Sequence, residues 1–265
     1  MSEGKFVQAN GLEIYYRETG KGQPLILLHG ATDTHQLWDP FIPDLSQSYR
    51  VITPDSRGHG RTNNPQGNLS YSLMADDLAD FIRVLSLDRP YIFGYSDGGQ
   101  IALEMGMRYA DLPGALVVGG AWYRFSKEYQ DSLSAAGFVG PGEINFQVYE
   151  SFTPADWRER MKSDHPSPVE NYPVNLLQNL AELFWTPLKY KPEDFMKIIA
   201  PTMILVGEKD EMVPVQESRE MANLIPGAEL VIIPGATHTR VITSDGAFLE
   251  LIKSFFSAVT SSTIT

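Results

Sequence analysis

The fold of this chain is decided by residues 91–103, which read YIFGYSDGGQIAL. A short apolar and aromatic run, typical of a buried strand, leads into a tight turn that holds Ser96, and a helix follows at once. Gly94 and Gly98 flank the serine in the pattern G-x-S-x-G, where larger side chains would clash with neighbouring backbone. We predict a strained turn that lifts the Ser96 hydroxyl clear of the sheet, beside the free N–H groups of the helix. The simpler alternative is a serine that only caps the helix.

Length and composition limit the classes of protein to which the chain can belong. Its 265 residues, 43% of them hydrophobic, suffice for one large α/β domain with a small insertion. The formal charge of -12 argues against nucleic acid or an anionic membrane as a partner. The absence of cysteine excludes disulfides and zinc–thiolate sites. The N-terminus lacks the apolar core of a signal peptide, and no apolar run approaches the roughly 18 residues that span a bilayer, so we expect a cytoplasmic protein.

Apolar runs and amphipathic segments alternate along most of the chain. We expect a β-hairpin over residues 6–10 and 12–18, joined by Asn10-Gly11. The predicted strands that follow span residues 25–28, 50–54, 91–93, 115–119, 202–206 and 229–233. The predicted helices span residues 36–45, 73–87, 174–185, 215–224 and 247–258, with a further helix start at Thr153-Pro154-Ala155-Asp156. This alternation is typical of an α/β fold, a mainly parallel twisted sheet with helices on both faces.

The rhythm changes in the middle of the chain, where apolar strand runs disappear and aromatic residues and prolines increase. We therefore expect a core formed by residues 1–122 and 201–265. Residues 123–200 are expected to form a helical cap inserted over one end of the sheet.

Three side chains at separate strand ends can together activate a serine. A neutral serine is a poor nucleophile, and His238, with an ordinary pKa of about 6.5, is suited to take its proton. Asp210 follows another strand and can hold the imidazole in one tautomer. Ligands of parallel sheets bind beyond the carboxyl ends of the strands, where Ser96, Asp210 and His238 are expected to meet. Taken singly, Asp210 could be a turn residue and His238 a surface histidine, while Glu208 and Glu211 are rival acids.

Taken together, these features resemble the α/β-hydrolase superfamily over essentially the whole chain. The chain order of nucleophile, acid and base agrees with that family. One departure is Thr237, which stands where the family commonly has a glycine before the base. The resemblance is specific for the fold and far less specific for a substrate. It rests on His29-Gly30 with Trp38 downstream, Asp55-Ser56-Arg57-Gly58-His59-Gly60, Gly94-Tyr95-Ser96-Asp97-Gly98-Gly99, Gly207-Glu208-Lys209-Asp210-Glu211-Met212-Val213-Pro214 and a late histidine.

The resemblance implies roles for particular positions. The backbone N–H groups of Ala31 and Asp97 would form an oxyanion hole, where each donor contributes about 3 kcal/mol of transition-state stabilisation. His29, Arg57 and His59 would stabilise loops and turns. The Asp97 carboxyl suits a helix N-terminus, and if it faced the pocket it would disfavour an anionic substrate. No cofactor is implied, and the five histidines lack ligand spacing, so no metal site is expected.

The aromatic residues of the insertion bear on the substrate. A cap over a catalytic serine excludes water and selects its substrate by shape. We predict that the pocket is lined by Trp122, Tyr123, Trp157 and Trp185. Such walls favour a small or medium apolar acyl or aryl group over a polymer.

The leading hypothesis is a cofactor-independent, esterase-like serine hydrolase that cleaves a small-molecule ester through an acyl-enzyme. Hydrolysis of a carbon–carbon bond in a ring-cleavage product, lactone hydrolysis and peracid formation stay open, because the same three residues serve them. From other classes, a small-molecule receptor and a non-catalytic scaffold are the alternatives. The sequence leaves open whether the chain is a monomer or a homodimer.

Overall fold

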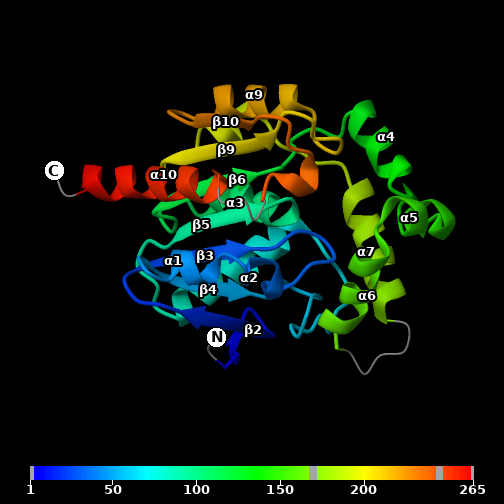
Figure 1. The fold of residues 1–265 in the computed structure, drawn as a ribbon, viewed down its shortest axis with the longest axis horizontal. Coiled ribbons are helices and arrows are strands. Elements are labelled where there is room, and N and C mark those ends of the chain that lie inside the picture. Colours follow the sequence, from blue (N-terminus) through cyan, green and yellow to red (C-terminus); the bar gives the residue numbers. More distant parts are fainter. Residues whose placement is uncertain (1–2, 167–171, 243–246, 264–265) are drawn as a thin grey trace.

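An eight-stranded sheet lies at the centre of the computed structural model, which describes residues 3–166, 172–242 and 247–263 (Figure 1). Its strands are β1 (Lys5–Ala9), β2 (Leu12–Thr19), β3 (Gln23–Leu28), β4 (Tyr49–Pro54), β5 (Tyr91–Tyr95), β6 (Ala115–Gly119), β9 (Thr202–Gly207) and β10 (Glu229–Ile233). They follow the order β1-β2-β4-β3-β5-β6-β9-β10. β1 and β2 form the predicted hairpin, β2 pairs antiparallel with β4, and the remaining pairs are parallel.

Two apolar cores cover the two faces of this sheet. Successive side chains of a strand point to opposite faces, so Ile26 and Leu28 of β3 join one core while Leu25 and Leu27 join the other. The first core includes side chains of α2 (Tyr71–Val84), α3 (Asp97–Arg108) and α9 (Val215–Leu224). The second includes side chains of the short helix η1 (His35–Trp38), α1 (Ile42–Leu45) and α10 (Ala247–Thr263). The predicted fold class, a mainly parallel sheet with helices on both faces, is confirmed.

Between β6 and β9 the chain leaves the sheet and forms a mainly helical insertion. Its elements are α4 (Lys127–Ala135), β7 (Phe138–Gly140), β8 (Glu143–Ile144), α5 (Phe146–Phe152), α6 (Ala155–Asp164), α7 (Tyr172–Trp185) and α8 (Pro192–Phe195). Figure 1 shows α4, α5, α6 and α7 together at the right-hand end of the sheet, toward which β9 points. These helices are consistent with a cap, and we propose residues 123–200 as its limits. The two-stranded sheet of β7 and β8 has no counterpart in the predicted elements.

Prolines explain two differences from the predicted helices. The segment predicted as one helix over residues 36–45 is split into η1 and α1, because Pro40 and Pro43 lack the N–H groups that a continuous helix needs. A helix does start within residues 153–156, as predicted, but the expectation that the Thr153 side chain caps it is wrong. Pro154 is extended (φ -55°, ψ 145°) and precedes α6, so Thr153 ends α5 and its side chain does not cap α6.

The last helix, α10, continues to Thr263 instead of ending at residue 258. The hydroxyl groups of Tyr91 and Thr260 hydrogen bond at 2.9 Å, and Thr260 Oγ1 also donates to the Phe256 carbonyl. A contact with the sheet therefore keeps the polar end of the chain helical, although its composition is typical of a tail.

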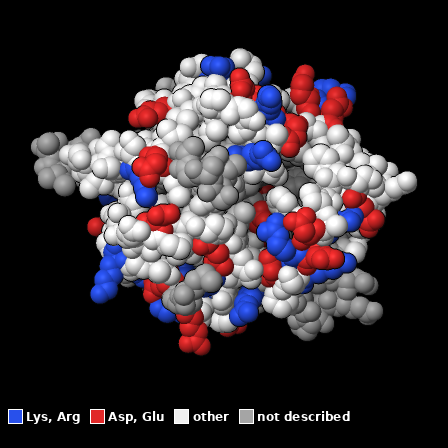
Figure 2. All heavy atoms as spheres, in the orientation of Figure 1, with Lys and Arg blue, Asp and Glu red and all other residues white. Residues whose placement is uncertain are grey.

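The surface carries mixed charge. Figure 2 shows acidic and basic side chains interspersed over one face of the molecule, although the formal charge of the chain is -12. Some of these exposed charges are paired, as Lys127 is with Asp131 on α4. Within the three described ranges, no helix is long and apolar enough to cross a membrane.

Candidate active site

Ser96 occupies the turn between β5 and α3. Its backbone has φ 54° and ψ -117°, a conformation that residues other than glycine rarely adopt. A Cβ atom at Gly94 would lie 1.9 Å from the carbonyl oxygen of Gly98, and one at Gly98 would lie 2.4 Å from that of Leu28. Close backbone packing therefore requires glycine on both sides of the serine, and the serine is held in a strained turn.

Ser96, Asp210 and His238 form a continuous line of hydrogen bonds. Ser96 Oγ is 3.0 Å from His238 Nε2, and His238 Nδ1 is 2.9 Å from Asp210 Oδ2. His238 opens the short helix η2 (His238–Arg240) after β10, while Asp210 lies in the loop after β9. The structure thus brings together three residues that are distant in the sequence.

The Asp210 carboxylate is surrounded by donors. Its Oδ1 atom accepts hydrogen bonds from the backbone N–H groups of Met212, at 2.9 Å, and Val213, at 2.7 Å. The side chain is fully buried. The carboxylate can only accept, so it holds the His238 proton on Nδ1 and leaves the Nε2 lone pair facing Ser96.

Two further side chains hold the backbone of His238. Tyr95 Oη donates to the His238 carbonyl oxygen at 2.8 Å, and Glu211 Oε2 accepts from the His238 N–H at 3.0 Å. The other rival acid, Glu208, accepts from the Gly235 N–H instead. No local pattern predicts these contacts, because Tyr95 and His238 are 143 residues apart.

The electrostatic environment of His238 favours its protonated form. Burial by itself would lower the pKa, but the negative charges of Asp210, Glu211 and Asp97 outweigh burial and raise the pKa of His238 above its ordinary value of 6.5. A general base must be neutral to accept a proton. Activity at this site is therefore expected to rise with pH as His238 loses its proton.

Replacing Glu211 by glutamine tests this electrostatic effect. The amide oxygen can still accept from the His238 N–H, but the charge that helps to raise the pKa of His238 is lost. We expect the acidic limb of the pH profile of kcat/KM for a neutral ester to move to lower pH. Glu208→Gln is the matched control, since that carboxylate binds Gly235. An unmoved limb in Glu211→Gln, or an equal movement in the control, would contradict this assignment.

The loop after β3 approaches the other side of Ser96. A Cβ atom at Gly30 would lie 3.2 Å from Ser96 Cβ, which places the neighbouring Ala31 close to the serine. Asp97 is the first residue of α3, where a backbone N–H has no acceptor within its helix. The Ala31 N–H also has no hydrogen-bond acceptor in the part of the chain that the structure describes. Both predicted donors of the oxyanion hole are therefore available to a ligand.

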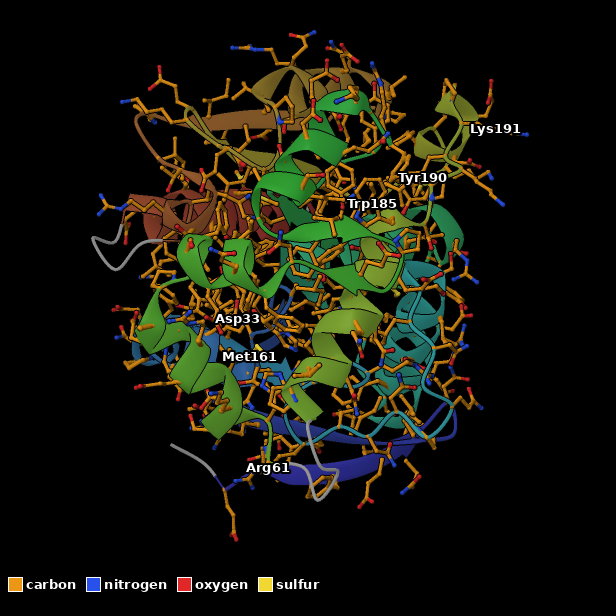
Figure 3. The ribbon with its side chains drawn as sticks, turned by 90° about the vertical axis from the view of Figure 1, so that its right-hand side faces the viewer. Asp33, Arg61, Met161, Trp185, Tyr190 and Lys191 are labelled. Atoms are coloured by element: carbon orange, nitrogen blue, oxygen red, sulfur yellow. The ribbon has the colours of Figure 1, made fainter. Side chains whose placement is uncertain are left out.

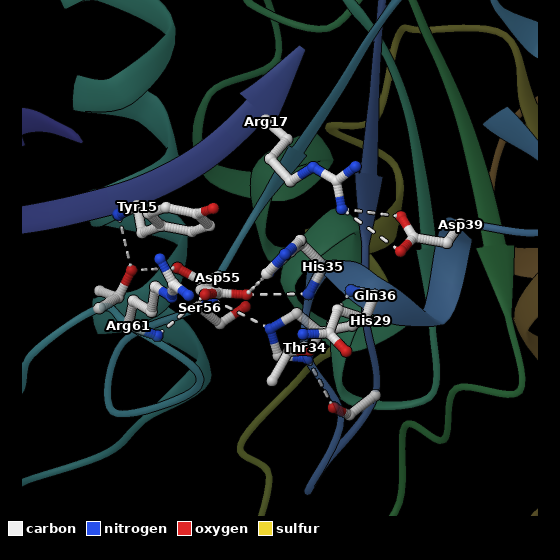
Figure 4. Close-up of polar contacts among 12 residues, drawn as sticks. Tyr15, Arg17, His29, Thr34, His35, Gln36, Asp39, Asp55, Ser56 and Arg61 are labelled. Carbon is white, nitrogen blue, oxygen red and sulfur yellow. Dashed lines mark hydrogen bonds and ion pairs between the residues drawn. The ribbon is translucent and has the colours of Figure 1, made fainter. Parts of the chain in front are cut away.

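Buried hydrogen bonds hold this loop and the turn that follows β4. His29 Nε2 accepts from the Ser56 backbone N–H at 3.0 Å (Figure 4), and burial lowers the pKa of His29 to about 4. Arg57 forms a buried ion pair with Asp77 at 2.6 Å. His59 Nδ1 donates to the Arg57 carbonyl oxygen at 3.0 Å. These contacts support the structural roles expected of His29, Arg57 and His59.

A cavity of about 440 Å³ lies between Ser96 and the inserted helices. Both Ser96 and His238 line it, as does the loop of Ala31. Most of the wall is apolar or aromatic, and includes Trp122, Tyr129, Leu133, Phe138, Trp157 and Phe184. The site is therefore open to a substrate with a small or medium apolar group.

The four tryptophan and tyrosine residues predicted for the pocket divide into two pairs. Trp122 and Trp157 line the cavity, whereas Tyr123 and Trp185 do not. Tyr123 Oη donates to Glu220 at 2.7 Å, and Trp185 Nε1 donates to the Phe138 carbonyl oxygen at 3.0 Å. Composition cannot separate the two pairs, because aromatic side chains serve packing and pocket walls alike.

The Asp97 side chain combines the two roles considered from the sequence. Its Oδ1 atom accepts from Tyr71 Oη at 2.8 Å, which ties the start of α3 to α2. The buried carboxyl also lines the cavity. Burial raises the pKa of Asp97 to about 7. An acidic group therefore lies in the wall next to Ser96.

Comparison with known proteins agrees with this architecture. The family model for the alpha/beta hydrolase fold matches residues 23–245. The chain is 29% identical to a 2-hydroxy-6-oxo-6-(2'-aminophenyl)hexa-2,4-dienoic acid hydrolase from Metapseudomonas resinovorans, over 96% of this chain and 90% of the relative. A meta-cleavage product hydrolase from Pseudomonas fluorescens has a similar structure, with a TM-score of 0.71, 25% identity and coverage of 96% and 98%. A thermophilic esterase from Thermogutta terrifontis shares the fold, with a TM-score of 0.75, 24% identity and coverage of 97% and 99%. The chain belongs to the alpha/beta hydrolase fold family.

Proposed function

We propose that the chain is a serine hydrolase that cleaves a small or medium, apolar, ester-like carbonyl substrate through an acyl-enzyme. The observation that carries this proposal is the line of hydrogen bonds from Ser96 Oγ through His238 to Asp210, with heavy-atom distances of 3.0 and 2.9 Å. A hydroxyl within reach of a neutral imidazole, itself oriented by a buried carboxylate, is an activated nucleophile.

The first half of the reaction forms the acyl-enzyme. Ser96 Oγ attacks the carbonyl carbon while His238 Nε2 takes the hydroxyl proton. The carbonyl oxygen becomes an oxyanion, which the N–H groups of Ala31 and Asp97 bind. His238 then gives its proton to the departing alkoxide, which leaves as an alcohol, and Asp210 stabilises the imidazolium in between.

The second half repeats the same steps with water as the nucleophile. His238 takes a proton from water while the hydroxide attacks the acyl carbon. The bond between the acyl group and Ser96 Oγ breaks, and the proton returns from His238 to Ser96. The products are a carboxylic acid and free enzyme.

The charge of the cavity wall supports an ester as substrate over a ring-cleavage acid. The relative from M. resinovorans is named for a dienoic acid, which is anionic at neutral pH. The wall of the cavity contains Asp33, Asp97 and Glu211, and none of the described residues that line it is a lysine or arginine. A substrate carboxylate would therefore be buried beside these acids without a lysine or arginine partner. Carbon–carbon bond hydrolysis is the second candidate, favoured by the 29% identity to that relative.

A substrate panel tests the choice between the two reactions. We expect p-nitrophenyl acetate and butyrate to be hydrolysed with a kcat/KM about 100-fold or more above that of a 2-hydroxy-6-oxo-dienoic acid, because the cavity offers the acid no lysine or arginine. The reverse ranking would establish the second candidate in place of the first. A lactone, and an ester with added hydrogen peroxide, extend the panel to lactone hydrolysis and peracid formation. Negligible turnover with ligand-dependent binding of a partner protein would favour a receptor.

A further inference from the structure

Asp33 is a buried carboxyl group without a partner. It is 9% exposed and lines the cavity on the loop that also carries Ala31. Its carboxyl oxygens make no hydrogen bond or ion pair with any residue in the described part of the chain. Figure 3 views the molecule from the side of the cap and labels Asp33, and the charges of Arg160 and Asp164 on α6 act on this carboxyl group. The group therefore faces the cavity where the loop meets the cap.

A purely structural role does not explain Asp33. Two buried acids near the site, in contrast, have partners: Asp77 pairs with Arg57, and Asp55 Oδ1 accepts from the His35 N–H and Nδ1 at 2.8 Å each. An unpartnered carboxyl group in an apolar wall costs stability that a neutral residue would not. A ligand that interacts with the Asp33 carboxyl group would explain why an acidic residue occupies this position.

The charged groups around Asp33 set its protonation. Burial raises the pKa of Asp33 to about 8; the positive charge of Arg160 on α6 lowers it, and the negative charges of Asp164 on α6 and Asp97 on α3 raise it. Arg160 does not pair with Asp33, and its guanidinium instead lies 5.5 Å from the centroid of the Trp157 ring. A ligand cation would therefore meet a carboxyl group that has no competing partner.

The other side chains of the cavity wall also favour a cationic ligand. Asp97 and Glu211 add two more acidic side chains to the wall, and the described lining residues include no lysine or arginine. Trp122, Tyr129 and Trp157 also line the cavity, and aromatic rings attract cations. Acidic and aromatic groups together are the environment in which proteins bind quaternary or primary ammonium groups.

We propose that Asp33 binds a positively charged ammonium group of the substrate, so that the site prefers cationic esters to neutral esters of the same shape. This inference rests on the proposed ester hydrolysis and names the substrate class for that same site. The ion pair forms at the cavity wall, while Ser96, His238 and Asp210 carry out the chemistry as described above.

Two esters that differ only in charge test the inference. Acetylcholine and 3,3-dimethylbutyl acetate have the same shape, with a cationic nitrogen replaced by carbon. We expect kcat/KM of the wild-type protein to be about tenfold or more higher for acetylcholine, because opposite charges attract more strongly in a buried site than in water. The Asp33→Asn variant should lose the preference. Asp164→Asn, which removes a neighbouring acid outside the cavity wall, should keep it.

The pH dependence of the preference is a second readout. Both esters depend equally on the protonation of His238, so that dependence cancels in their ratio. The ratio should rise with pH in the wild-type protein as Asp33 loses its proton, and should be flat in Asp33→Asn. A ratio near one at every pH in the wild-type protein, or a preference that survives in Asp33→Asn, would overturn the proposal.

Binding separates failure of this inference from failure of the proposed function. Calorimetric titration of Ser96→Ala with choline and with 3,3-dimethylbutan-1-ol measures the same preference without turnover. If neither ester is hydrolysed but choline binds about tenfold or more tightly, the ester chemistry is wrong and the role of Asp33 stands. If choline binds no more tightly than the neutral alcohol, the inference is overturned, whether or not esters are hydrolysed.

Discussion

Replacement of Ser96 by alanine is expected to lower kcat for p-nitrophenyl butyrate by about 10^4-fold or more. The hydroxyl is the only atom of this side chain that can form the acyl-enzyme, and it lies 3.0 Å from its base. The residual rate would come from substrate binding and from the N–H groups of Ala31 and Asp97, which do not depend on the hydroxyl. Steady-state kinetics with a burst-phase measurement checks the prediction, since the burst of released nitrophenol should also disappear.

The fold of Ser96→Ala should be unaffected. Its backbone stays in the same strained turn, because glycine at positions 94 and 98 leaves the close contacts unchanged. Ser218→Ala on α9 is the matched control, since it removes a serine hydroxyl that does not line the cavity. We expect normal turnover in the control and similar thermal unfolding of both variants. Turnover of Ser96→Ala within about tenfold of the wild-type value would be incompatible with an acyl-enzyme at this serine.

Replacement of Asp210 by asparagine is expected to reduce kcat by a similar factor, about 10^4-fold. The carboxylate accepts from His238 Nδ1 and from the backbone N–H groups of Met212 and Val213. An amide has only one accepting atom, so its NH₂ group would face either those N–H groups or the imidazole. The orientation that keeps the oxygen on the two backbone N–H groups turns the NH₂ group toward His238 Nδ1. Nδ1 must then accept a hydrogen bond, so the proton of His238 lies on Nε2, and this tautomer cannot take the Ser96 proton.

The rival acids supply the control for Asp210→Asn. Glu208→Gln changes a carboxylate of the same loop that binds Gly235 and does not contact His238. We expect it to keep kcat within about tenfold of the wild-type value. Equal losses in both variants would point to a general disturbance of the loop, and a large loss only in Glu208→Gln would move the acid role from Asp210 to Glu208.

Local signals in the sequence predict the sheet and the position of Ser96. Apolar runs such as residues 25–28 mark strands buried on both faces, and their side chains do alternate between two cores. The glycines at positions 94 and 98 indicate that backbone segments pass very close to the Ser96 turn, and this indication is visible in the local sequence. The predicted strands 202–206 and 229–233 correspond to β9 and β10.

Local sequence patterns do not predict contacts between distant parts of the chain. The bond from Tyr95 to the His238 carbonyl joins residues on β5 and η2, and nothing around either residue indicates the other. Tertiary packing also decides which of the predicted aromatic residues line the cavity. Trp122 and Tyr123 are neighbours in sequence, but only Trp122 lines it. Asp33 resembles any polar loop residue until the cap covers it.

Labelling with a fluorophosphonate tests the central claim most directly, because the probe reacts with an activated serine and does not require the natural substrate. The serine oxygen displaces fluoride from phosphorus, and the adduct can be located by mass spectrometry of the digested protein. We expect a single adduct on Ser96 in the wild-type protein. In His238→Ala, Ser96 should be labelled at least about 100-fold more slowly. Absence of an adduct on Ser96, or labelling of Ser96 at an unchanged rate without His238, would contradict the account.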